Sequence, residues 1–131
     1  MTRRRADRIQ GQRKRKGVLT VPCQLNDKYH RTFLVDSGVA FTVISQQLAR
    51  EMKLDITHPL RQIQIASAHQ VAQAPVVRLD SLQVGDKKVN HLEVLIVDLP
   101  VALRVDGLLG VNFLEKYRVT FEFEQATLVL R

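Results

Sequence analysis

The feature that most constrains the fold is a succession of short apolar segments separated by turn-forming residues. These segments recur from residue 18 onward, and dipeptides such as Gly85-Asp86 and Asp106-Gly107 lie between them. Strands need only about five or six residues, whereas helices that fill a core are about twice as long. The sequence shows no long helical period and no alternation of strands with helices. It therefore predicts an all-β domain of short strands.

Hairpins account for most of the predicted strands, because each turn signal is flanked by two apolar segments. The three expected hairpins pair residues 18–25 with 29–36, 62–66 with 71–79, and 81–84 with 88–97. Near the C-terminus, Val119, Phe121 and Phe123 alternate with polar residues, a period of two that predicts a strand. Residues 127–130 can pair back onto it.

Two short helices are expected among these strands. Ser45 can cap a helix that runs to Lys53. Asn112 and Glu115 have the spacing of a capping box at the start of the other. Strands, an Asp- and Gly-containing motif and a short helix thus occur once in each half of the chain, which suggests a pseudo-symmetric barrel of two similar β units.

The formal net charge of +7 comes from the N-terminus. Residues 1–17 hold eight of the twenty Lys and Arg residues and one of the thirteen acids, so the remainder is formally neutral. This segment lacks aromatic residues and has few apolar ones, so we expect a flexible basic arm at residues 1–17 and a folded domain at residues 18–131. Such an arm is usually only solvated. The alternative is a weak contact with nucleic acid or an anionic surface.

Composition also narrows the class of protein. No segment resembles a signal peptide, and none approaches the roughly 20 apolar residues that span a bilayer. We therefore expect a soluble intracellular protein in the cytoplasm. The single cysteine, Cys23, cannot form an internal disulfide and lies in an apolar run, which predicts a buried side chain. No Cys or His residues have zinc-binding spacing, so no metal is expected.

Asp36 is the residue that strand formation does not explain. It follows the apolar residues 33–35 and precedes Ser37 and Gly38. A carboxylate in apolar surroundings is costly unless it is paired or neutralised, so Asp36 is a candidate site residue. An Asp-Ser-Gly tripeptide also fits an ordinary turn. A second motif, Leu-Leu-Gly at 108–110, again precedes a short helix.

The two motifs in this order resemble those of the retropepsin-like aspartic proteases, over residues 18–131. In that family an apolar-apolar-Asp-Ser/Thr-Gly motif carries the catalytic acid, matched here by residues 34–38. The later apolar-apolar-Gly motif, matched by residues 108–110, threads beneath the active-site loop. The resemblance implies an all-β closed barrel of the acid-protease fold and an aspartic endopeptidase without a cofactor.

The resemblance also implies a homodimer. This route of peptide hydrolysis needs two carboxylates that share a proton, and the chain supplies one such motif. Asp36 would therefore face its own copy across a twofold axis. Ser37 would donate a hydrogen bond across the dimer, and Gly38 would allow close approach of the copies. Terminal strands of retropepsins often interleave, so residues 119–123 are expected to join the dimer sheet.

The expected substrate contacts follow from the same resemblance. The catalytic motif continues with residues 39 and 40, and the hairpin at residues 64–72 occupies the place of the flap that closes over a polypeptide substrate. The expected substrate-binding residues are Val39, Ala40, Ala66, Ser67, Ala68, His69, Leu108 and Leu109.

Two departures from the family pattern keep an alternative open. The family commonly places a polar residue where this chain has Val39-Ala40, and the flap tip contains no glycine. The alternative is a catalytically inactive domain of the same fold, used for dimerisation or peptide binding. A small β-barrel that binds nucleic acid is a weaker alternative, because the folded part is neutral and lacks tryptophan.

Overall fold

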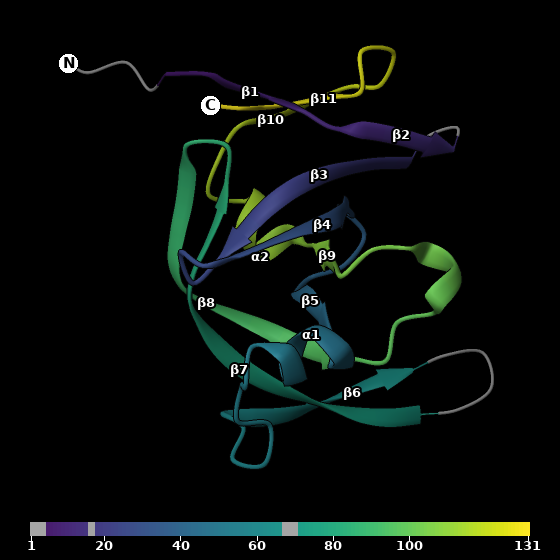
Figure 1. The fold of residues 1–131 in the computed structure, drawn as a ribbon, viewed down its shortest axis with the longest axis vertical. Coiled ribbons are helices and arrows are strands. Elements are labelled where there is room, and N and C mark those ends of the chain that lie inside the picture. Colours follow the sequence, from purple (N-terminus) through teal and green to yellow (C-terminus); the bar gives the residue numbers. More distant parts are fainter. Residues whose placement is uncertain (1–4, 16–17, 67–70) are drawn as a thin grey trace.

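The computed structural model describes residues 5–15, 18–66 and 71–131, and strands form most of its regular structure (Figure 1). In chain order the elements are β1 (Asp7–Gln10), β2 (Gln12–Arg15), β3 (Val18–Leu25), β4 (Tyr29–Val35), β5 (Thr42–Ser45), α1 (Gln46–Glu51), β6 (Arg61–Ala66), β7 (Val71–Val84), β8 (Lys87–Val97), the 3-10 helix η1 (Val101–Leu103), β9 (Gly107–Leu109), α2 (Val111–Leu114), β10 (Val119–Glu122) and β11 (Thr127–Leu130).

The strands form two sheets. Within the described residues, the larger sheet has eight strands in the order β2-β3-β4-β9-β5-β8-β7-β6, and the smaller has three in the order β1-β11-β10. β3 also pairs with β7, so the larger sheet turns back on itself. The all-β prediction is confirmed, and the closed barrel stays a prediction.

Within the described residues, the turns of the predicted hairpins lie where the sequence placed them, whereas the turn at residues 67–70 lies outside those residues. β3 and β4 are joined through Asn26 and Asp27, whose φ angles of 52° and 58° match a tight turn of two left-handed residues. β7 and β8 pair on either side of Gly85-Asp86. The C-terminal hairpin of β10 and β11 is also present.

β7 is one long strand where the sequence predicted two, at residues 71–79 and 81–84. The polar residues Asp80 and Ser81 do not end the strand, because their side chains point to opposite faces, as successive side chains of a strand do. Asp80 is exposed to solvent, while Ser81 points inward and is 3 % exposed.

Both short helices form, but one capping prediction is wrong. The Ser45 hydroxyl accepts a hydrogen bond from Leu48 N at 3.1 Å and caps α1, as expected. The N-cap of α2 is Gly110, which has no side chain to supply a cap. Asn112 instead uses its amide oxygen to accept hydrogen bonds from Thr42, so this side chain joins α2 to β5 rather than capping its own helix.

The prediction of a flexible arm is corrected for residues 7–15, which lie in strands. β1 pairs with β11 and β2 pairs with β3, so this segment extends both sheets. Ile9 is 6 % exposed and packs in the main core. Burial of this side chain and pairing along two existing strands offset the entropy of ordering the segment. Composition alone does not reveal such pairing.

The main core lies between the sheets and the two short helices. Its largest fully buried side chains include Phe33 on β4, Phe113 on α2, and Leu128 and Leu130 on β11. Cys23 belongs to this core and is 3 % exposed, as the sequence predicted. Burial raises the pKa of its thiol, which keeps the reactive thiolate form unpopulated.

Candidate active site

Asp36 is the first residue after β4, at the point where the chain leaves the sheet. β9 lies beside β4, with Val35 opposite Leu109 in a parallel register. The backbone N–H of Asp36 extends this pairing and donates to the Leu109 carbonyl at 3.0 Å. β9 also pairs with β5 on its other side. The second motif therefore lies between the two strands that flank the loop at residues 36–41.

The Asp36 carboxylate is oriented by its own loop. Its Oδ1 atom accepts a hydrogen bond from the backbone N–H of Gly38 at 2.9 Å. A side chain at Gly38 would begin 3.1 Å from the same oxygen, a tight contact that glycine avoids. Asp36 is half-buried, whereas Ser37 and Gly38 are exposed. The acid thus lies at the surface, next to groups open to a second molecule.

The rest of the loop is held by the start of α2. Val39 O accepts a hydrogen bond from Val111 N at 2.9 Å, and Ala40 O accepts one from Asn112 N at 3.0 Å. These N–H groups have no partner within a helix, so the loop carbonyls satisfy them. The two sequence motifs are therefore joined by backbone hydrogen bonds.

A buried polar network stiffens the same junction. Thr42 is fully buried, and both its N–H and its hydroxyl donate to Asn112 Oδ1, at 2.8 and 2.9 Å. The Thr42 hydroxyl oxygen accepts from Gly110 N at 3.1 Å, and the Asn112 amide donates to Glu93 O at 2.7 Å. Because every partner is satisfied, this network fixes the loop without a buried unpaired group.

Gly110 is required for close approach in this junction. A Cβ atom there would lie 2.6 Å from both the carbonyl carbon and the carbonyl oxygen of Phe41. No side chain fits without moving the backbone, so glycine lets the second motif pass directly beneath the loop.

An apolar cavity of about 490 Å³ opens beside the loop. Its walls come from the loop, from β6 and from the end of β8, and only one lining side chain is polar. The lining residues are Val39, Ala40, Phe41, Val43, Ile63, Gln64, Ile65, Ala66, Leu95, Val97, Leu99 and Leu108. Such a cavity suits an apolar side chain of a bound molecule.

A second cavity, of about 460 Å³, is lined by residues that precede Asp36 in the sequence and by a segment near η1. Leu34, two residues before the acid, lines it together with Val18, Thr20 and the segment 102–105, which comprises the end of η1 and the two residues after it. This cavity was not predicted from the sequence. Strand parity carried a signal for it, since Leu34 must face away from the buried Phe33.

The structure separates the residues that the sequence assigned to substrate binding. Val39, Ala40, Ala66 and Leu108 line the first cavity. Leu109 is fully buried in the main core, so its side chain does not face that cavity. The flap-tip residues Ser67, Ala68 and His69 lie outside the described residues. Phe41, Ile63 and Ile65 were missed, although the alternation of isoleucine with glutamine in β6 indicated one apolar face.

Asp106 holds strands together. Its N–H donates to Thr32 O at 2.9 Å, and its carbonyl accepts from Ser45 N at 2.9 Å. Its carboxylate accepts from Thr32 N at 3.4 Å. These contacts join β4 to the end of β5, which fits the turn role inferred from the sequence.

The described residues contain no group of three or more His, Cys, Asp or Glu side chains that could hold a metal ion. In the same part of the chain, no helix has the length and apolar character needed to cross a membrane.

Comparisons with known proteins agree with this geometry. A family model described as "Aspartyl protease" matches residues 21–113, which include both motifs. The crystal structure of a retropepsin-like aspartic protease from Rickettsia conorii superposes with a TM-score of 0.74 and 20% sequence identity. The match covers 96% of this chain and 91% of that chain, and at this identity it shows the fold. A comparison with curated proteins gave no significant match.

Proposed function

The chain belongs to the aspartyl protease family and has the retropepsin-like fold, and from this premise we propose that it is an aspartic endopeptidase active as a homodimer. The observation that carries the proposal is the setting of Asp36. The acid lies at the surface, its carboxylate is oriented by Gly38 N–H, and residues on either side of it in sequence line two cavities, one of them apolar. We propose that residues 18–131 carry this activity.

The chemistry requires a second copy, because one chain offers one Asp-Ser-Gly motif. Two carboxylates a few ångströms apart share one proton, since both cannot be ionised cheaply. The ionised Asp36 takes a proton from water, and the water oxygen attacks the peptide carbonyl carbon. The protonated Asp36 of the partner copy donates its proton to the carbonyl oxygen. The tetrahedral intermediate then breaks its C–N bond, and the amine leaves with a proton from the dyad.

The loop residues support distinct steps. The hydrogen bond from Gly38 N–H to Asp36 Oδ1, at 2.9 Å, fixes the orientation of the carboxylate. Ser37 is exposed beside it, and we propose that its hydroxyl donates a hydrogen bond to the partner copy. Gly38 leaves room for that copy.

The first cavity favours polypeptides with an apolar side chain on one side of the cleaved bond, and the second, whose lining is mixed, would accept a side chain on the other side. Val39, Ala40, Ala66 and Leu108 would contact one such side chain, and Leu34 and residues 102–105 another. We propose that Ser67, Ala68 and His69 at the flap tip approach the substrate from the opposite side. Specificity would then depend on side-chain size more than on charge.

Replacement of Asp36 tests the proposal. Asp36→Asn keeps the size and loses the shared proton, so we expect kcat/KM on an unfolded protein substrate to fall by about 10²–10⁴-fold or more. Asp80→Asn is the matched control, because Asp80 is an exposed acid on β7. Cleavage that persists in Asp36→Asn at the control's rate would contradict the proposal. A dimer that cleaves nothing would support the inactive alternative.

A further inference from the structure

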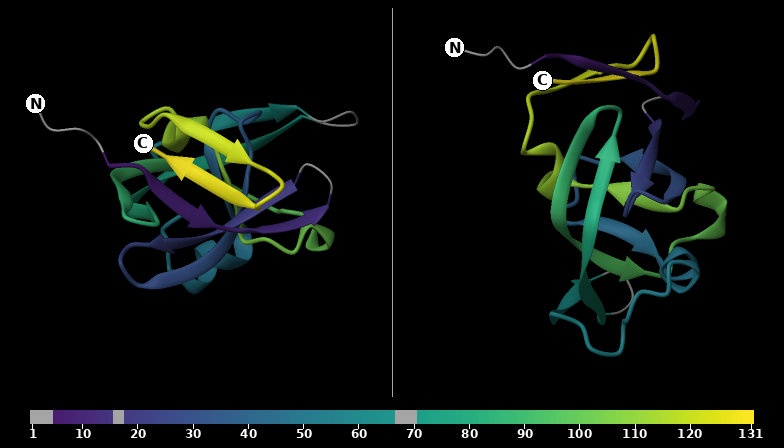
Figure 2. Two further views of the ribbon diagram at one scale, coloured as in Figure 1. Left: turned by 90° about the horizontal axis from the view of Figure 1, so that it is seen from above. Right: turned by 60° about the vertical axis from the view of Figure 1, so that its left-hand side comes forward.

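Within the described residues, three strands of the same chain form the smaller sheet. β11 lies in the middle, with β1 on one edge and β10 on the other (Figure 2, left). Val119 and Phe121 of β10 are partly buried against the chain's own core, so two of the three apolar residues expected to join a dimer sheet are engaged within the chain, while Phe123 is exposed. Neither edge of β11 is open to a strand from a second copy.

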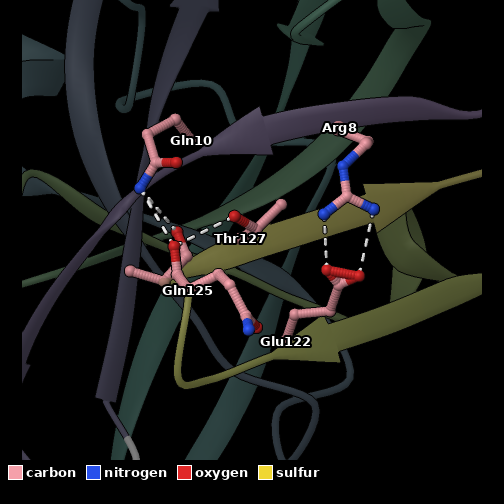
Figure 3. A network of polar contacts seen from close by, with 6 residues as sticks. Arg8, Gln10, Glu122, Gln125 and Thr127 are labelled. Atoms are coloured by element: carbon pink, nitrogen blue, oxygen red, sulfur yellow. Dashed lines mark hydrogen bonds and ion pairs between the residues drawn. The ribbon is translucent and has the colours of Figure 1, made fainter.

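β1 is anchored across β11 by an ion pair with two hydrogen bonds. The Arg8 guanidinium donates to the two carboxylate oxygens of Glu122 on β10, at 3.0 and 2.6 Å. Figure 3 shows these side chains meeting over β11. Gln10 adds a second anchor, because its amide donates to the carbonyls of Gln125 and Ala126 in the β10–β11 turn, at 3.1 and 3.4 Å. β1 is thus tied to the end of β10 and to the turn that follows it.

The start of β1 is also fixed to the turn between β7 and β8. The Asp7 carboxylate accepts a hydrogen bond from Asp86 N at 2.6 Å. Lys87 Nζ donates to Arg5 O at 2.8 Å. β1 therefore connects the C-terminal hairpin to the larger sheet.

The connection between β1 and β2 is too short for β1 to reach another molecule while β2 stays in place. Gly11 is the single residue between the strands, and its N–H donates to Ala126 O at 2.8 Å. A Cβ atom on Gly11 would overlap the carbonyl oxygen of Thr20, so the chain passes directly against β3. This geometry favours pairing of β1 within its own chain.

We propose that β1 is an intrachain clasp, and that the homodimer assembles through the face carrying the Asp36 loop, without exchange of terminal strands. That the partner is a second copy of this chain rests on the proposed function. The clasp itself follows from the contacts of β1 and stands independently of catalysis.

A charge-reversal experiment separates pairing within a chain from pairing between chains. Arg8→Glu and Glu122→Arg each place like charges opposite one another, and the double variant restores an opposite-charge pair. Residues 127–130 form β11, which pairs with β1, so their amide hydrogens exchange faster when β1 detaches. We expect exchange to accelerate roughly threefold or more in each single variant and to return to the wild-type rate in the double variant. Arg8→Gln, which introduces no repulsion, should give a smaller acceleration.

A mixture of the Arg8→Glu and Glu122→Arg variants distinguishes the two kinds of pairing. If β1 were exchanged, the mixed dimer would place each Arg or Glu at position 8 against its opposite at position 122, and protection would return. For a clasp within the chain, the mixture exchanges as fast as the separate variants. Recovery in the mixture overturns the proposal, as does a double variant that stays unprotected or an unchanged rate in both Arg8 variants. A wild-type chain that sediments as a monomer at every concentration would defeat the proposed function without altering these results.

Discussion

Two adjacent leucines in the second motif have different roles because neighbouring residues of a strand face opposite sides. Leu109 is fully buried in the main core, whereas Leu108 is half-buried and lines the apolar cavity. One motif thus supplies a core residue and a surface for a bound molecule. Both leucines were expected to contact the substrate because they belong to the same motif.

Replacement of each leucine by alanine separates these roles. Leu109→Ala leaves a cavity in the core, so we expect the free energy of unfolding to fall by about 2–5 kcal/mol. Leu108→Ala should cost clearly less stability and instead raise KM for substrates with a large apolar side chain. Urea unfolding and steady-state kinetics on the same preparations check both values. Equal losses of stability would contradict the assignment.

Glu122 gives the clasp a pH dependence. The hydrogen bond from Arg8, and then its charge, lower the pKa of Glu122 below the ordinary value of 4.5. A carboxylate with a depressed pKa in the folded state stabilises the fold above its unfolded pKa, and this contribution disappears as the pH falls through the folded pKa.

Glu122→Gln should therefore remove part of the acid sensitivity of the fold. We expect the wild type to lose more stability than the variant as pH falls below about 4.5, measured by urea unfolding at a series of pH values. Glu124→Gln, on the same hairpin and exposed, is the control. Parallel stability curves for Glu122→Gln and wild type would show that the ion pair has no role.

At the scale of elements, the site depends on β9 passing between β4 and β5. Gly110 ends this strand and leaves no room for a side chain beneath Phe41. Gly110→Ala should cost about 1–3 kcal/mol through overpacking and should shift the Asp36 loop, because the adjacent N–H groups hold its carbonyls. Both unfolding free energy and kcat should fall. A variant with wild-type stability and kcat would contradict this view of the junction.

The elements that the sequence predicted well are those with a local cause. The Asn26-Asp27 turn and the Ser45 cap depend on residues within a few positions, and both are present. The errors have tertiary causes. Asn112 was assigned to a local capping box but bonds to Thr42, some 70 residues away. β1 and β2 were missed because only pairing with β11 and β3 orders them.

At the scale of the whole molecule, the chain presents its acid on a loop and completes its terminal sheet internally. β1, near the start of the described residues, lies beside the C-terminal strand β11 in the smaller sheet (Figure 1). The resemblance seen in two short motifs predicted the family and the fold, and backbone hydrogen bonds join these two motifs in the structure. The two cavities were only partly predicted, since their walls combine segments that are distant in sequence.

The central claim is that each copy contributes one Asp36 to a shared site, and a mixing experiment tests it directly. Wild-type protein is combined with Asp36→Asn at a constant total concentration, and cleavage of an unfolded substrate is measured. If two wild-type copies are required, activity follows the square of the wild-type fraction and falls to about a quarter in an equal mixture. Activity that follows the fraction linearly, with about half remaining, would contradict the claim.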